Sequence, residues 1–558
     1  MYKPKFKNTE PAEFVLNEYT RGYAQCMDNN WNFAVYAQDP SVSIYQNEYN
    51  AGYVQGKIQG NAMIKATRNN TWRWYMLDEG PGANTTDIPI GAPEIATKHL
   101  TDNYNYLTDW AEKNKADERT QNIIRLMFRM FGIYEGAADK EARKNVTFED
   151  LKLANMKPEE VKMGVDADPL TFIDIYFINA QMDLWDAASK ELGIAMNKLE
   201  KDVLDHTLTP VSEYDQKLAK TEDRYLKPGN CSGFVHKLDD GEIYWAHTSW
   251  CCLMAQTCAM TYVIGSDFLT QNSFCPGQFG SNTDFGFNGH GIGFNETTET
   301  YFYNESKTLG IWLTWRAAAA EMFSKSIDDF YGYVTLDNTG TYLNAYMLVD
   351  AYRGEFGVID MSYARFALMK ANGTDLTVTD STGYKPTFLD YDNHMVSPTH
   401  VLGCNIPIYK RIWRELETID GAPKRRYQLY RNIESVIDMH SAKDLITYNE
   451  SLEPISIAGR WDKNYGTSEF IRYQPHGSID GKVFSASEVR KVLENLSMKP
   501  SINGTKTSFW MKFGSPRIGG TPFVWSESRW AKFKLPEDVD FIPDAIDGNW
   551  NRVKMFME

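Results

Sequence analysis

The 558-residue chain has no long apolar run, and this absence excludes a class of protein. A membrane-spanning helix needs about 20 consecutive apolar residues. The most apolar stretch, residues 250–264, is shorter and is interrupted by Gln256 and Thr257, so no transmembrane span is expected. The opening residues, MYKPKFKNTEPAEF, carry lysines but no apolar segment of a signal peptide, so none is expected within the chain as given.

Basic charge and cysteine are also scarce. The 58 Lys and Arg against 74 Asp and Glu give a net charge of -16. Nucleic-acid binding depends on cations that neutralise phosphates, so no nucleic-acid partner is expected. The 7 cysteines are too few for a disulfide scaffold of this length, and their odd number leaves at least one unpaired within the chain.

Common catalytic and metal-binding motifs are missing as well. The chain contains no H-E-x-x-H, G-x-S-x-G, P-loop or C-x-x-C pattern, and GHGIGF lacks the spacing of a dinucleotide fingerprint. Cys251, Cys252 and Cys258 lie in an apolar stretch that we interpret as helical, where free cysteine usually packs as a small hydrophobe. Neither a metal site nor a cofactor is therefore expected.

Glycosylation sequons, in contrast, are abundant. The N-x-S/T pattern favours a secretory-pathway protein, either lysosomal or secreted. A glycan at Asn230 would obstruct a neighbouring cleavage site discussed below, so we predict that this asparagine is unmodified. The other glycosylation candidates are Asn69, Asn84, Asn145, Asn295, Asn304, Asn372, Asn449, Asn495 and Asn503.

The hydrophobic pattern predicts an α+β protein. Apolar and polar residues alternate in 31–65, which predicts paired strands leading into a helix. Helical spacing of apolar residues in 94–133 and 171–198 predicts buried helix faces. With aromatic residues at 14% of the chain, a sizeable core can form. Strands are predicted within 345–360 and a helix over 485–497.

A polar segment divides the chain. From about 205 to 230 the sequence has two prolines, alternating charges and little periodicity, which predicts an exposed linker at 208–230. It separates an amino-terminal part, 1–207, from a part that begins at Cys231 and continues to 558. The segment CSGFVHKLDDGEIYWAHTSW follows, in which apolar stretches flank the polar LDDGE turn, a pattern that predicts a β-hairpin.

Cys231 stands where the linker meets this hairpin. A break of the Asn230–Cys231 bond would make it an amino terminus with its own base, since an α-amine titrates near ~7.7–8.0 against ~10.4 for lysine. Such an amine can take the thiol proton and activate the nucleophile. The residues alone leave open the plainer interpretation, a strand-end thiol without a catalytic role.

Six segments, in order, resemble the phospholipase B-like family of lysosomal and secreted amino-terminal-nucleophile hydrolases. The first segment covers the predicted strand and helix near the amino terminus, and the second begins at the predicted nucleophile. The segments are NNWNFAVYAQ with YNAGYVQGKIQG, NCSGFVHKLDDGEIYWAHTSW, GHGIGFNETTET, DNTGTYLNAYMLVD, GCNIPIY and QPHGSIDGKVFS.

The resemblance implies a four-layer αββα sandwich that cuts itself before Cys231. The fragments 1–230 and 231–558 would remain associated and form one composite domain, with strands from both in the layers, and a homodimer stays open. The implied substrates are the acyl esters of glycerophospholipids. Two alternatives remain: an amidase acting on N-acylated amines, and a catalytically degenerate lysosomal or secreted glycoprotein.

The resemblance also implies roles for individual residues. Cys231 matches the nucleophile, and His247 matches a family histidine close to it, with a direct catalytic part or an orienting one. Asn344 matches an asparagine of the oxyanion hole. Asn338 would assist, although Asn-x-Gly also predicts a plain turn. Around Asp284 the chain has CPG and TDFG and departs from the family pattern. Of the properties that the resemblance implies, the shape of the substrate pocket is therefore the one it supports least.

Overall fold

The structure is a computed structural model. The residues that it describes are 8–75, 91–204, 231–252, 257–265, 268–281, 284–299, 309–415, 422–449, 456–459, 476–494, 498–514, 523–524, 526, 545–546 and 549–558. Within these ranges, none of the helices combines the length and the hydropathy that a membrane crossing requires. The predicted linker, 208–230, lies outside the described residues.

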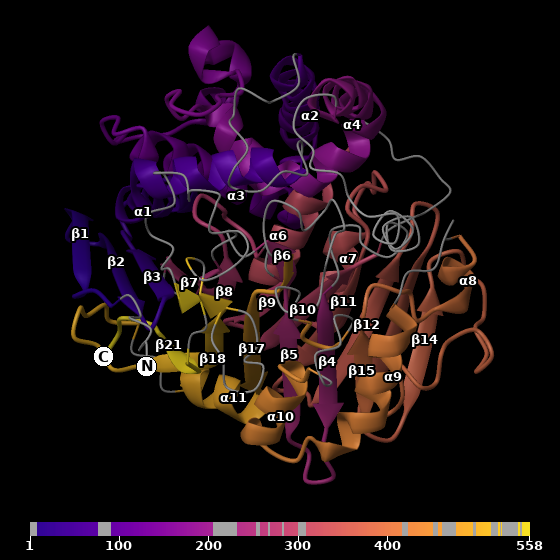
Figure 1. Cartoon of the computed structure of the whole chain (residues 1–558). Coiled ribbons are helices and arrows are strands. Elements are labelled where there is room, and N and C mark those ends of the chain that lie inside the picture. Colours follow the sequence, from indigo (N-terminus) through magenta and orange to yellow (C-terminus); the bar gives the residue numbers. More distant parts are fainter. Residues whose placement is uncertain are drawn as a thin grey trace.

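The larger of two main sheets has 11 strands (Figure 1). All neighbouring pairs run antiparallel except β3 and β7, which are parallel. Strands from before and after residue 231 therefore share this sheet. In sheet order the strands are β1 Ala12–Asn17, β2 Thr20–Met27, β3 Asn30–Ala37, β7 Cys258–Ile264, β8 Phe268–Phe274, β9 Phe285–Asn288, β10 Ile292–Thr298, β11 Asn344–Asp350, β12 Glu355–Met361, β13 Phe366–Ala371 and β14 Leu376–Asp380.

The smaller main sheet has 6 strands and contains the predicted hairpin. Its order is β15 His400–Gly403, β4 Ser232–Lys237, β5 Ile243–Thr248, β17 Asp480–Ser485, β18 Thr507–Phe513 and β21 Asn551–Lys554. Two short pairs complete the strands of the described residues: β6 Trp250–Cys252 with β16 His476–Ser478, and β19 Phe523–Val524 with β20 Ala545–Ile546.

Helices lie on both sides of the paired sheets (Figure 1). One group lies on the outer side of the large sheet and shares a core with it, with α1, α6 and α7 in contact with strands: α1 Ile44–Tyr75, α2 Ala92–Asn114, α3 Glu118–Ala137, α4 Phe172–Leu204, α6 Leu313–Phe323 and α7 Ile327–Val334. The other described helices are α8 Lys410–Trp413, α9 Ala422–Asn432, α10 Met439–Ile446 and α11 Ala486–Glu494. All four contribute side chains to the core around the small sheet.

Two hydrophobic cores follow from the alternation of side chains along the strands. On β11, Tyr346 and Leu348 face the helices, whereas Met347 and Val349 face the small sheet. Successive residues of a strand point to opposite faces, so a strand buried on both faces reads as an unbroken apolar run. The large sheet is therefore covered by helices on one face and by the small sheet on the other.

Helices α1 and α3 cross at backbone contact. A methyl group placed on Gly132 would lie 2.1 Å from the carbonyl oxygen of Tyr49, and one on Gly52 would lie 2.0 Å from that of Arg129. Both distances are far below van der Waals contact, so only glycine fits at the crossing. The spacing Gly52 to Gly56 on one helix meets Gly132 to Gly136 on the other.

The predicted elements are mostly confirmed, and the fold class is mixed α and β as expected. The helices predicted over 94–133, 171–198 and 485–497 correspond to α2 and α3, α4, and α11. The helix predicted around Cys251, Cys252 and Cys258 is wrong, because these residues lie on β6 and β7. Strand β7 is buried along its whole length, which removes the alternation that would have marked it as a strand.

Candidate active site

Cys231 directly precedes β4, the first strand of the predicted hairpin. Strands β4 and β5 pair antiparallel, and their register places His247 opposite Gly233. The apolar residues on both sides of the LDDGE turn lie in the core around the small sheet, which confirms the hairpin. Cys231 is 4% exposed and His247 is 0% exposed, so the hairpin brings the thiol and the imidazole together in the interior.

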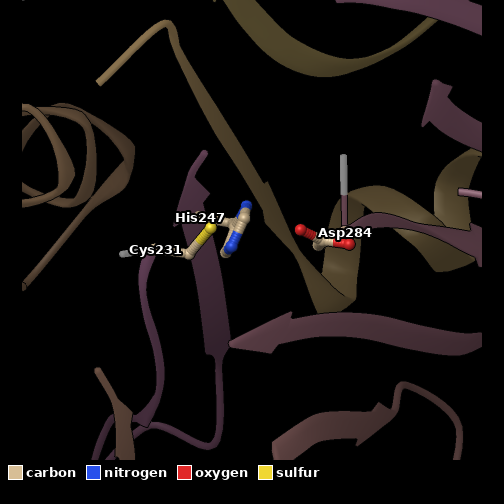
Figure 2. A group of neighbouring side chains, drawn as sticks. All are labelled: Cys231, His247 and Asp284. Carbon is tan, nitrogen blue, oxygen red and sulfur yellow. The ribbon is translucent and has the colours of Figure 1, made fainter. Parts of the chain in front are cut away.

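Asp284 completes a cluster with these two side chains. The Cys231 sulfur, a ring nitrogen of His247 and a carboxylate oxygen of Asp284 all lie within 4.8 Å of one another (Figure 2). Asp284 precedes β9 in the large sheet and has φ 64°, a left-handed conformation that Asp and Asn adopt more readily than most other residues.

Burial keeps both reactive groups of the hairpin uncharged. It raises the pKa of the Cys231 thiol well above its usual range, and the acidic groups of Asp284 and Glu296 raise that pKa further. Burial also holds the pKa of His247 well below its usual range, and the Lys482 ammonium lowers it again. A neutral thiol therefore faces a neutral imidazole at neutral pH, so the thiol needs a base to become a nucleophile.

Asp284 shares a hydrogen bond with Glu296 on β10. Burial raises the pKa of Asp284 to about 6 and that of Glu296 well above its usual range. Two buried carboxyl groups in contact cannot both ionise easily, so the pair retains a proton on Glu296. The hydroxyl of Tyr342 donates to Oε1 of Glu296 over 2.8 Å and helps to fix the pair.

A buried ion pair lies beside His247. Strand β17 pairs with β5 so that Lys482 is opposite His247. Lys482 Nζ donates to Oδ2 of Asp480 over 2.8 Å and to Oγ of Ser249 over 2.7 Å. Asp480 also accepts the backbone N–H of Ser249 and the hydroxyl of Thr257. These hydrogen bonds compensate the charges, which a buried ion pair requires.

Arg425 on α9 donates hydrogen bonds to the residues at the start of β4. Its guanidinium donates to the carbonyl oxygen of Cys231, to Oγ of Ser232 over 3.2 Å and to Oδ1 of Asn405 over 3.0 Å. It also lies over the ring of Trp250, 5.3 Å from the centroid. Arg425 is 2% exposed, so its donors serve to position the Cys231 backbone. Arg425 was not among the residues predicted from the sequence, where its local signal is the basic run PKRRY.

Asn344 begins β11 and is fully buried. Its Nδ2 donates to the hydroxyl of Tyr346 over 3.3 Å, and its Oδ1 has no partner in the described part of the chain. An amide nitrogen carries two hydrogens, so one remains available. Asn344 lies two positions before Tyr346, on the sheet face that Tyr346 presents to the helices.

Asn338 has a structural part in a turn. Its Oδ1 accepts the backbone N–H of Gly340 over 2.9 Å and a guanidinium N–H of Arg316 over 3.0 Å. Its Nδ2 donates to the carbonyl oxygens of Ser362 and Tyr363. Both amide hydrogens are used, so Asn338 has no donor left for a substrate. The plainer of its two interpretations, the turn, agrees with these contacts.

The sequons fall into three groups. The prediction is wrong for Asn69 and Asn295, which are 2% and 0% exposed and whose amides donate to backbone carbonyls, so this fold has no room for a glycan there. Asn145, Asn372 and Asn503 are exposed, and Asn449 is partly buried, with its amide donating to the carbonyl oxygen of Ala458. The candidates Asn84, Asn304 and Asn495, and the cleavage-site residue Asn230, lie outside the described residues.

A thiol, an imidazole and a carboxylate that converge from three strands or strand ends are the groups of a nucleophilic hydrolase. A family model described as Phospholipase B matches residues 158–542. The chain belongs to the phospholipase B family, and the resemblance found in the ordered motifs is confirmed.

Two curated relatives agree with this assignment. Phospholipase B-like protein G of Dictyostelium discoideum is 22% identical over 370 residues, which cover 58% of this chain and 56% of the relative. Phospholipase B-like 1 of Rattus norvegicus is 24% identical over 458 residues, which cover 75% of this chain and 72% of the relative. The chain thus spans little more than half the length of the first relative.

Two solved structures are similar over a smaller part. Both are variants of a conjugated bile acid hydrolase from Clostridium perfringens, with a TM-score of 0.27, 10% identity, and coverage of 51% of this chain and 89% of theirs. A likeness at this level carries no conclusion about fold or activity.

Proposed function

We propose that the chain is an amino-terminal cysteine hydrolase that cleaves itself before Cys231 and then hydrolyses acyl ester bonds of glycerophospholipids. The observation that carries this proposal is the cluster of Cys231, His247 and Asp284 at the junction between the predicted linker and β4. Family membership supports a hydrolase, and the names of the two relatives point to phospholipid. We further propose that the arrangement of helices, large sheet, small sheet and helices is the αββα sandwich of this enzyme class.

The proposed self-cleavage is an acyl shift followed by hydrolysis. The Cys231 thiol attacks the carbonyl carbon of Asn230, the peptide C–N bond breaks, and the nitrogen takes up the thiol proton and leaves as the neutral α-amine of Cys231. Water then opens the thioester, which leaves a carboxylate on Asn230, restores the thiol and releases one proton to the amine or to solvent. Arg425 supports this step because it fixes the Cys231 carbonyl while the bond on the other side of the residue breaks.

The freed α-amine supplies the base that the buried Cys231 thiol needs to become a nucleophile. The imidazole of His247 is a weak base here, whereas an α-amine ordinarily titrates near ~7.7–8.0 and lies on the same residue as the thiol. It takes the thiol proton as sulfur attacks the ester carbonyl, the alcohol leaves with a proton, and water hydrolyses the thioester. His247 then orients the sulfur, and we assign the remaining amide hydrogen of Asn344 to the developing oxyanion.

We expect the two fragments to stay together after cleavage. Strand β3 of the first fragment pairs in parallel with β7 of the second over seven residue pairs, from Trp31 with Cys258 to Ala37 with Ile264. The sequon excess supports a lysosomal or secreted location, and the exposed sequons at Asn145, Asn372 and Asn503 are compatible with it.

Self-cleavage is tested with the expressed chain on a denaturing gel beside Cys231→Ala and Cys231→Ser. The wild type should yield two bands, and sequencing of one should begin at Cys231, while the alanine variant should remain one band of 63.9 kDa. A wild type that stays intact after acidic incubation would sink the self-cleavage proposal. The rate of hydrolysis is then measured for a phospholipid and for an N-acylated amine that carry the same head group and acyl chain. The faster reaction shows whether the protein is an esterase or an amidase.

A further inference from the structure

We propose that Cys231, His247 and Asp284 form a binding site for Zn²⁺ or a similar thiophilic divalent cation, with three protein ligands and one open coordination position. The binding itself does not depend on the proposed function. Its consequence, inhibition of the hydrolase, rests on that function.

The donor set matches the ligands that zinc prefers. Zinc binds cysteine sulfur at about 2.3 Å, and histidine nitrogen and carboxylate oxygen at about 2.0–2.2 Å, and sites with three protein ligands keep a position for water or substrate. The three donor atoms lie within 4.8 Å of one another, so small side-chain rotations bring them around one cation (Figure 2). They come from one strand, β5, and from the residues that directly precede β4 and β9, so both sheets contribute to the site.

The imidazole supplies an independent observation. His247 is 0% exposed, and its ring nitrogens have no side-chain hydrogen-bond partner among the residues that the structure describes, although the backbone of Glu296 acts on the ring. Buried polar atoms are nearly always paired, so the ring nitrogen that faces Cys231 and Asp284 is suited to a further ligand. A bound cation would satisfy this nitrogen.

The charges of the site also favour a divalent cation. A Cys231 thiolate and an Asp284 carboxylate together balance two positive charges, and the thiol proton leaves to solvent as the metal–sulfur bond forms. Lys482, the nearest cation along β17, is already paired with Asp480 within the protein. The divalent ion and its three ligands therefore carry no net charge together. Buried charges are tolerated when they are paired or bound to a metal in this way.

Metal binding and catalysis compete for one sulfur atom. A thiolate that donates its electron pair to a cation cannot attack an acyl carbon, so the bound metal is expected to inhibit hydrolysis and a chelator to relieve the inhibition. Cleavage before Cys231 places an α-amine three bonds from Sγ, within reach of the open position. The cleaved chain is therefore expected to bind the cation more tightly than the intact chain.

The test is a titration of the chelator-treated full chain with Co²⁺, whose thiolate complexes absorb through sulfur-to-metal charge transfer, followed by displacement with Zn²⁺. We expect one Co²⁺ per chain with this absorption. Cys231→Ser should abolish the absorption, and His247→Gln and Asp284→Asn should each weaken binding at least ~10-fold, since even loss of an outer partner costs about 10–100-fold.

Two matched variants control for other thiols and histidines. Cys26→Ser removes a buried thiol of β2, and His440→Gln removes an exposed histidine that pairs with Asp444. Both should bind Co²⁺ as the wild type does, and circular dichroism should show all variants folded. Absence of the charge-transfer absorption in the wild type, or wild-type affinity in the three cluster variants, overturns the proposal.

Activity is measured separately on metal-free protein. Failure of that protein to cleave itself or its substrate counts against the proposed hydrolase and leaves the cobalt spectrum unaffected. A metal-free enzyme that is active but shows no cobalt–thiolate absorption counts against the metal site alone.

Discussion

Asn344 and Asn338 lie close together in sequence, but their amides differ in what they can donate. Asn344→Ala should lower turnover of the proposed hydrolase by roughly 10²–10³-fold with little change in KM, because a lost oxyanion donor weakens only the transition state. Steady-state kinetics on the cleaved protein measure this.

Asn338→Ala serves as the control for this variant. It removes four hydrogen bonds in a turn, so it should lower the free energy of unfolding by about 1–3 kcal/mol while turnover per folded molecule persists. Unchanged turnover in Asn344→Ala would remove Asn344 from the mechanism. Because Asn344 lies on the helix side of the sheet, this variant also tests whether that face contributes to the site.

Arg425 acts through the backbone of Cys231, so its replacement should affect self-cleavage first. Arg425→Met should slow the appearance of the two fragments at least ~10-fold, because a 1 Å misplacement of a reacting group can cost about 10²-fold. The rate is followed on denaturing gels after expression at low temperature. Arg431→Met, on the exposed side of the same helix, should cleave at the wild-type rate, and equal rates for the two variants would contradict the positioning role.

At the scale of elements, the crossing of α1 and α3 depends on glycine. Gly132→Ala should lower the free energy of unfolding by about 1–3 kcal/mol, because the added methyl group meets the Tyr49 carbonyl and the helices must separate. Urea denaturation measures the change. Gln121→Ala, at an exposed position of the same helix, should stay within about 0.5 kcal/mol of the wild type, and a neutral Gly132→Ala would show that the helices shift without cost.

The hairpin and the buried strand β7 show which elements can be predicted. Polar LDDGE between apolar stretches has one plausible pairing, and β4 and β5 form it. The stretch around Cys258 has no such alternation, since the large sheet buries β7 on both faces. A short apolar run of this kind reads equally as a helix or a strand until its neighbours are known.

For the molecule as a whole, buried carboxyl groups predict greater stability in acid. Burial raises the pKa of Asp360 to about 7 and that of its neighbour Glu299 well above its usual range. In the unfolded chain an Asp titrates near ~3.9, so between about pH 4 and pH 7 the folded state binds more protons than the unfolded state. The stabilisation is complete below the unfolded value and is lost as the pH rises through about 7.

The free energy of unfolding should therefore fall between pH 5 and pH 8, by an amount on the order of 1–4 kcal/mol. Urea denaturation at the two pH values measures this. Asp360→Asn, which resembles the protonated acid, should reduce the difference, whereas the exposed Asp444→Asn should leave it unchanged. Stability that rises toward pH 8 would contradict the assignment. The expected direction suits an acidic lumen such as a lysosome.

The sequence by itself determined the family, the hairpin and the place of Cys231, because ordered motifs and local turn chemistry depend on residues close together in the chain. Only the tertiary structure decided which groups surround that thiol. Asp284 arrives from the large sheet, Lys482 from β17 and Arg425 from α9, and no periodicity relates such distant segments. The same packing buries Asn69 and Asn295. Burial depends on residues distant in the chain, and a three-residue sequon contains no information about them.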